Sequence, residues 1–200
     1  MIQIRRNVFE TNSSSTHSIA IPKSHEHDAE KYRNRSVSFN IGEFGWSFEE
    51  ENPADYLYTA IYDCYFNSEE EMNDKIRKLK DTLDKYQIHY DLGDVKLTKE
   101  IGPYDGKERV YLENGYIDHG DELREFLDAV FSSDDTLLNF IFNGLVFTGN
   151  DNCDGDEEGQ AFPQQPFIYD YDFYTGKETE KPNPYYLPNA NEFDWYVKGN

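Results

Sequence analysis

The chain of 200 residues has few cysteines, few basic residues and no long hydrophobic run. Its two cysteines, Cys64 and Cys153, are far apart and form no Cys-x-x-Cys pair, which argues against a zinc knuckle or a disulfide scaffold and indicates a reducing compartment. No segment approaches the roughly 18–20 apolar residues of a membrane helix. The first residues include two arginines, but the apolar segment of a secretory signal does not follow them. We therefore expect a cytoplasmic protein without a membrane partner.

Basic residues are outnumbered by acidic ones, with 19 Lys and Arg against 40 Asp and Glu and a formal net charge of −21. A surface of this charge repels a polyanion, so binding of free duplex DNA is not expected. Contact with a nucleic acid would require a local basic patch. Alternatively, the protein imitates a nucleic acid and occupies a basic groove of another protein.

The negative charge is unevenly distributed along the chain. Residues 1–50 carry 6 basic and 7 acidic side chains, whereas residues 51–200 carry 13 and 33. Chance variation around a solvated acidic face is one explanation. The other is a near-neutral N-terminal motif region, 1–50, attached to an acidic α+β body, 51–200, within one compact domain.

The aromatic content is high for a chain with 37% hydrophobic residues, because Tyr, Phe and Trp make up 16% of it. Each aromatic side chain buries roughly 150–250 Å², so we expect a folded core despite the few aliphatic residues. Periodicity predicts an α+β fold with small antiparallel sheets and three to four helices. The predicted strands are 2–9, Ser18–Ile21, Val37–Ile41, Glu108–Leu112, Tyr116–Ile117 and Leu145–Thr148. The predicted helices run from Pro53 to about Phe66, along a stripe from Met72 to Tyr86, from Asp121 to Phe131 and from Asp134 to Asn143.

Local signals predict where some of these elements begin and turn. Asn114-Gly115 is a strong hairpin dipeptide, so we expect the strands on either side of it to pair. Asn52-Pro53 is typical of a helix start. The Thr11–Ser15 cluster predicts a turn or a helix cap.

The most unusual local sequence is 5–18, which combines two guanidinium groups, a carboxylate, six hydroxyls, two amides and an imidazole. Backbone N–H groups in a turn of short polar residues suit phosphate oxygens, and arginine adds a bidentate fork. The candidate phosphate- or RNA-binding residues are Asn12, Ser13, Ser14 and Ser15. Metal-free RNA cleavage needs a base for the ribose 2′-hydroxyl, an acid for the leaving group and a cation on the phosphorane. His17, Glu10 and the pair Arg5 and Arg6 are the candidates for these three catalytic roles.

The same stretch also has a structural interpretation. Ser and Thr hydroxyls in a turn close backbone hydrogen bonds, and a single histidine beside such a turn is more often a structural hydrogen-bonding group than a catalyst. Residue chemistry therefore leaves open whether this segment is a metal-independent ribonuclease site or a scaffold.

This stretch resembles a known signature. The run R-N-V-F-E-T-N-S-S-S-x-H-S-I, from Arg6 to Ile19 without a gap, resembles the N-terminal signature of small proteins encoded by phages and other mobile elements of Gram-positive bacteria. Thr148-Gly149-Asn150-Asp151-Asn152 resembles a second, weaker element. Some members with a similar N-terminus are identified as type II-A anti-CRISPR proteins, which disable Cas9 by interfering with its guide RNA or promoting its cleavage. The resemblance implies a bacterial host cytoplasm, with a Cas nuclease and its guide RNA as partners.

The acidic loop 150–158 invites comparison with a metal site. Asn150, Asn152, Asp154 and Gly155 fit the opening spacing of an EF-hand loop, but its twelfth position would be Ala161, which cannot ligate a metal through its side chain. We therefore expect no cofactor. The alternative is an adventitious Ca²⁺ or Mg²⁺ site in this loop. Its candidate ligands are Asp151, Asp154 and Asp156, and such ions could assist a phosphodiester reaction.

Acidic and aromatic residues also alternate in ways that suit binding. Four carboxylates fall within about two turns of one predicted helix, and two more alternate with tyrosines on a predicted strand, so that one face would be acidic and the other aromatic. The helical set is Asp121, Glu122, Glu125 and Asp128, and the strand set is Asp170 and Asp172 with Tyr169, Tyr171 and Tyr174. The competing explanation is charge kept for solubility.

Two function classes follow. The first is a mobile-element anti-defence protein of the anti-CRISPR type, which inhibits a Cas9–guide RNA complex and whose N-terminal motif touches or cleaves the RNA. The alternative is a non-enzymatic acidic mimic that blocks a basic groove of a nuclease or another DNA-binding protein.

Overall fold

The structure, a computed structural model, describes residues 15–45, 48–64, 69–101, 106, 108–118, 123–150, 162–172 and 174–198. Over these residues the chain folds into one four-stranded sheet, four two-stranded sheets and four α-helices. The predicted α+β class is therefore confirmed. The predicted strand 2–9 lies outside the described residues.

The four-stranded sheet is entirely antiparallel, with the order β12-β1-β9-β4. Its strands are β1 (Ser15–Pro22), β4 (Glu49–Glu51), β9 (Leu145–Asn150) and β12 (Phe193–Lys198). Strand β1 thus lies between two strands from the last third of the chain. The predicted strand Ser18–Ile21 is confirmed and begins earlier, at Ser15, because pairing with β9 continues to that residue.

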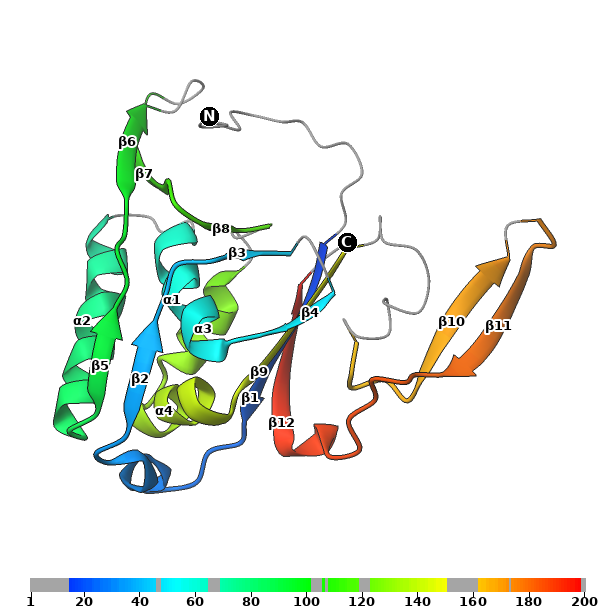
Figure 1. Ribbon diagram of the computed structural model, residues 1–200, viewed down its shortest axis with the longest axis horizontal. Helices are drawn as coiled ribbons and strands as arrows, with labels where there is room; N and C mark the ends of the chain where they lie inside the picture. Colours follow the sequence, from blue (N-terminus) through cyan, green and yellow to red (C-terminus); the bar gives the residue numbers. More distant parts are fainter. Residues whose placement is uncertain are drawn as a thin grey trace.

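The four α-helices lie on one side of this sheet (Figure 1). They are α1 (Pro53–Asp63), α2 (Glu69–Lys85), α3 (Arg124–Val130) and α4 (Asp134–Asn143). The predicted start of α1 is confirmed, because the Asn52 side chain accepts hydrogen bonds from the first backbone N–H groups of the helix. Ser133 caps α4 in the same way.

Aromatic rings fill the space between the sheet and the helices. The ring of Tyr56 on α1 packs edge-to-face on Phe44 and Phe126, with centroids 5.1 and 6.0 Å apart, and Phe126 packs on Phe140 at 5.2 Å. All four side chains are buried. Such edge-to-face contacts stabilise by about 0.5–1.5 kcal/mol beyond area burial, so the expected aromatic core is present.

Three further strand pairs lie around the helices. The pairs β2 (Ser36–Phe39) with β5 (His89–Leu92) and β3 (Glu43–Phe44) with β8 (Tyr116–Ile117) are parallel. The pair β6 (Leu97–Ile101) with β7 (Glu108–Leu112) is antiparallel. The predicted small antiparallel sheets are thus present, and two parallel strand pairs accompany them.

The hairpin predicted at Asn114-Gly115 is wrong, because β7 pairs with β6 and β8 pairs with β3. The Asn114 side chain accepts a hydrogen bond from Lys96 N and donates one to Asp94 O, which holds this turn against the segment before β6. Gly115 packs against another backbone segment, since a Cβ there would lie 2.5 Å from Gly42 O. Close approach of two chain segments, not a two-residue hairpin, explains this dipeptide.

The strands β10 (Phe167–Asp172) and β11 (Lys177–Pro182) form an antiparallel hairpin on the side of the large sheet opposite the helices (Figure 1). The predicted strand with alternating Asp and Tyr is confirmed as β10. Buried Asn183 holds the hairpin base, because its side-chain amide donates to Phe162 O and Gln165 O and its backbone N–H donates to Pro166 O.

Candidate functional site

The pairing of β1 with β9 brings together the described parts, 15–19 and 148–150, of the two sequence motifs that resemble the mobile-element signature. Ser15 lies opposite Asn150, Thr16 opposite Gly149 and His17 opposite Thr148. The two motifs are more than 120 residues apart in sequence. They meet at one end of the central sheet.

His17 is fully buried at this end of the sheet, with 0% of its surface exposed. Its Nδ1 lies 2.8 Å from the hydroxyl oxygen of Tyr56 on α1, and the two rings are 5.8 Å apart between centroids. The strand places His17 on the helix-facing side, in alternation with Ser18. The imidazole therefore joins the sheet to α1.

The Tyr56 hydroxyl stays neutral in this position. Burial raises its pKa well above the usual tyrosine range, and the nearby carboxylates of Asp63 and Glu51 raise it further. A protonated phenol can donate a hydrogen bond to His17 Nδ1 but cannot act as a base at neutral pH. The contact thus fits a buried structural hydrogen bond.

The backbone near β3 covers the other side of the imidazole. Gly45 has φ +111°, and a Cβ at this position would lie 2.7 Å from His17 Nε2 and 2.8 Å from Asp118 Cβ. Only glycine allows this backbone conformation and this close approach together. The loop therefore closes over the ring.

Thr148 and Glu51 extend the polar cluster across the sheet. The Thr148 hydroxyl donates to Glu51 Oε1 at 3.2 Å. Burial raises the pKa of the Glu51 carboxyl, although the Thr148 hydrogen bond acts against this rise. We call His17, Tyr56, Thr148 and Glu51 the β1 polar cluster.

The β1 polar cluster is positioned for structure more than for catalysis. A general base must come within about 2.6–3.2 Å of the proton that it removes, and the buried His17 ring offers no surface to an external RNA. Ser15, the other candidate residue that the structure describes, is also fully buried. The remaining candidates of the N-terminal motif lie outside the described residues: Arg5, Arg6, Glu10, Asn12, Ser13 and Ser14.

The candidate metal ligands Asp151, Asp154 and Asp156 also lie outside the described residues. Within the part of the chain that the structure describes, no group of three or more His, Cys, Asp or Glu side chains is arranged to hold a metal ion. Burial raises the pKa of the Cys64 thiol to about 11, so this cysteine is a poor nucleophile at neutral pH.

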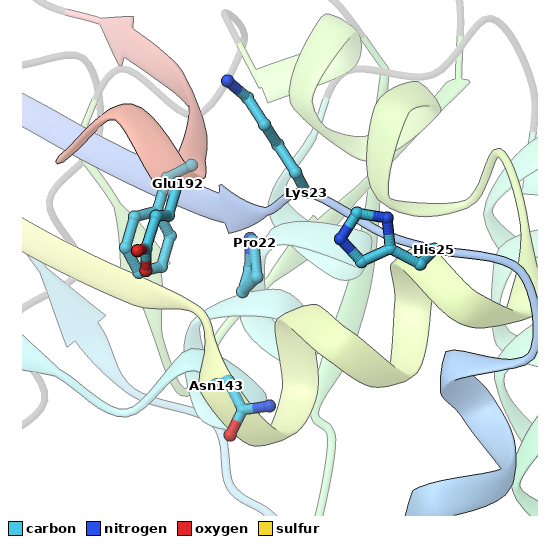
Figure 2. Close-up of a pocket in the computed structure, with 6 residues that line it drawn as sticks. Pro22, Lys23, His25, Asn143 and Glu192 are labelled. Atoms are coloured by element: carbon cyan, nitrogen blue, oxygen red, sulfur yellow. The ribbon is translucent and has the colours of Figure 1, made fainter. Parts of the chain in front are cut away.

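A surface hollow of about 550 Å³ lies at the other end of β1 (Figure 2). It is lined by Pro22, Lys23, His25, Asn143, Glu192 and Phe193. Lys23 Nζ donates to Asn191 O at 2.8 Å, so the cation is already engaged there. Five residues of strand, or about 17 Å, separate Pro22 from His17, so this hollow is distinct from the β1 polar cluster.

The acidic helix set is only partly available for binding. Helix α3 begins at Arg124, and Asp121 and Glu122 lie outside the described residues. Asp128 forms an ion pair with Lys75 at 2.7 Å, whereas Glu125 is exposed. Of the two carboxylates of this set that the structure describes, one is therefore engaged in an ion pair.

The hairpin β10–β11 exposes aromatic and acidic side chains together. Phe167, Tyr169 and Tyr174 are exposed, as are Glu178 and Glu180. Sequence reasoning singled out Tyr169 and Tyr174 but missed the other three. The sequence signal for Glu178 and Glu180 is the alternation of Lys, Glu and Thr in 177–181. It identifies an exposed face only when the pairing of this strand with β10 is known.

Among the helices that the structure describes, none has both the length and the apolar content needed to cross a bilayer. Comparisons of the chain with known protein families, curated proteins and solved structures found no match.

Proposed function

We propose that this protein is a mobile-element anti-defence protein that inhibits a Cas9–guide RNA complex, and that it does so by binding through its acidic surface. The signature-like run from Arg6 to Ile19 suggests the biological setting. The observation that carries the mode of action is the contrast between an acidic exterior and a buried His17.

The surface is negative because acidic side chains outnumber basic ones, 40 to 19, and several of the described cations are also engaged by carboxylates. Acidic partners engage the side-chain cations of Arg33, Lys75, Arg77, Lys85, Lys99 and Arg124. Two long stretches contain no basic residue: 36–74, with ten Asp and Glu, and 125–176, with eleven. The resulting field favours a basic partner.

A Cas nuclease offers a surface of opposite charge. Its guide RNA–DNA duplex is held in a positively charged channel that contacts the backbone rather than the bases. Carboxylates held on a folded protein can occupy such a channel, and opposite fields accelerate the encounter. Binding of this kind would block the nuclease without changing the guide RNA.

The second candidate function is cleavage of the guide RNA. One observation favours it, namely that the pairing of β1 with β9 places the described ends of the two signature-like motifs side by side. Arg5, Arg6 and Glu10 would then act without His17 as the base, because His17 is hydrogen-bonded to Tyr56 inside the fold.

Purified protein, Cas9 and guide RNA separate these functions in one experiment. Binding is measured at increasing salt, and guide length is read on a denaturing gel. We expect a complex that weakens as salt screens the charges, with full-length guide. Shortened guide, lost in a variant carrying Arg5→Ala, Arg6→Ala and Glu10→Gln, would support cleavage instead. Cleavage that EDTA abolishes would point to the loop 150–158.

A further inference from the structure

The outward face of the hairpin β10–β11 carries exposed aromatic side chains and exposed carboxylates next to each other. Strand register places Tyr169 opposite Glu180 and Phe167 opposite Pro182, and Glu178 follows on the same face. We call Phe167, Tyr169, Glu178, Glu180 and Pro182 the outward hairpin face. Ile168, which points the other way on β10, is buried.

The exposure of aromatic rings on the outward face of β10 is unusual for a half-buried strand. The solvated face of an antiparallel pair is normally polar, but here Phe167 is 45% and Tyr169 is 59% exposed. Five of the eight large hydrophobic side chains exposed by the described residues lie between Phe167 and Tyr186. Exposed aromatic residues such as Phe167 and Tyr169, side by side on one strand face, indicate an interaction surface.

The carboxylates define the chemistry of the partner. Glu178 and Glu180 are exposed, and neither has an ion-pair partner among the described residues. Aromatic rings alone could stack on the bases of single-stranded RNA, but such platforms lie in positively charged grooves. The segment 167–182 carries four acidic and two basic residues, so it disfavours phosphate and favours a cationic protein.

Arginine fits this face better than lysine does. Side chains directly opposite each other on paired strands have Cβ atoms about 4.5–5.5 Å apart, so the Tyr169 ring and the Glu180 carboxylate can contact the same group. A guanidinium can stack on an aromatic ring while its N–H groups bind a carboxylate. An ammonium ion lacks the planar surface needed for stacking.

We propose that the outward hairpin face binds an arginine-bearing segment of a basic protein, with the guanidinium stacked on Tyr169 and paired with Glu180. This inference rests on the proposed function and identifies the part of the acidic surface that docks. Asn183 closes the base of the hairpin through hydrogen bonds to Phe162 O and Gln165 O, so binding orders little additional backbone within it.

The test uses the full chain and two labelled peptides of equal length, one rich in arginine and the other in lysine. Glu178→Lys with Glu180→Lys reverses the charge of the face. The matched control, Glu70→Lys with Asp81→Lys, makes the same change in net charge on exposed positions of α2, at the far end of the molecule (Figure 1). We expect the hairpin variant to bind the arginine peptide about tenfold more weakly than the control does, equivalent to about 1.4 kcal/mol.

A second pair of variants tests the aromatic part. Phe167→Ala with Tyr169→Ala removes two exposed rings from this face, and Leu97→Ala with Ile101→Ala removes exposed apolar groups from β6. Only the first should abolish the preference for arginine over lysine. The inference is overturned if the wild type does not bind the arginine peptide, if both charge variants bind it equally, or if these hairpin changes abolish binding of a single-stranded RNA oligomer instead.

These outcomes separate the inference from the proposed function. Peptide binding uses no Cas9, so it can succeed or fail irrespective of the nuclease. Failure of the wild type to bind the Cas9–guide RNA complex would contradict the proposed function and leave the peptide result intact.

Discussion

The β1 polar cluster and the outward hairpin face place polar chemistry in opposite environments. His17 and Tyr56 are fully buried and hydrogen-bonded to each other. Tyr169 and Glu180 lie opposite each other on an exposed face. Of the candidate catalytic and phosphate-binding residues, the two that the structure describes, His17 and Ser15, are therefore buried in the scaffold, whereas residues that resemble ordinary surface are available to a partner.

The largest expected difference concerns the free energy of unfolding on removal of the His17 ring. His17→Ala leaves a cavity and removes the hydrogen-bond partner of the buried Tyr56 hydroxyl, so we expect a loss of about 2–4 kcal/mol. Tyr56→Phe should cost about 1 kcal/mol. Urea denaturation measures both, and the exposed His25→Ala is the control, with a change within about 0.5 kcal/mol.

The double variant with His17→Ala and Tyr56→Phe tests whether the two side chains stabilise the fold through their mutual contact. Because the two side chains are in contact, their effects should not add. If His17→Ala unfolds at the wild-type urea concentration and yet abolishes inhibition, the ring has a functional role that its burial does not suggest.

A smaller effect concerns the pH dependence of stability at Glu51. Burial raises the pKa of this carboxyl in the folded state above its ordinary value of 4.5. A raised carboxyl pKa means that the folded state loses stability as pH rises through this range. Glu51→Gln should therefore stabilise the protein near pH 7 and change it little near pH 4, while the amide oxygen still accepts from Thr148. Denaturation curves at both pH values measure this, and an equal effect at both would contradict it.

The smallest expected change in stability is at the hairpin. The paired substitutions Glu178→Lys with Glu180→Lys and Phe167→Ala with Tyr169→Ala lie on exposed positions, so each pair should alter unfolding by no more than about 1 kcal/mol. Thermal unfolding measures this. A larger loss would mean that the outward hairpin face packs on the body, which would remove the contrast with the β1 polar cluster.

Local signals in the sequence predicted the α+β class and the individual elements well. The caps at Asn52 and Ser133 mark where helices start, because their side chains satisfy neighbouring backbone N–H groups. Pairing was not predictable in the same way. The partners of β7 and β8 depend on distant contacts of Asn114 and Gly115, which no local pattern encodes.

Strand pairing also limited what the sequence could predict about the candidate site. The hydroxyl-rich composition near His17 fits both a phosphate-binding turn and the start of a buried strand, and the pairing of Ser15 with Asn150 decides that β1 already includes Ser15. The outward hairpin face needed the register of two strands before Glu180 could be placed opposite Tyr169. Residue types could be predicted there, but their neighbours could not.

Inhibition of DNA cleavage by the Cas9–guide RNA complex, with guide length read in the same reactions, tests the central claim most directly. We expect the wild type and the α2 control with Glu70→Lys and Asp81→Lys to inhibit cleavage while the guide stays full length. The hairpin variant with Glu178→Lys and Glu180→Lys should lose inhibition. Shortened guide in the wild-type reaction, or equal inhibition by the two charge-matched variants, would contradict binding through the outward hairpin face.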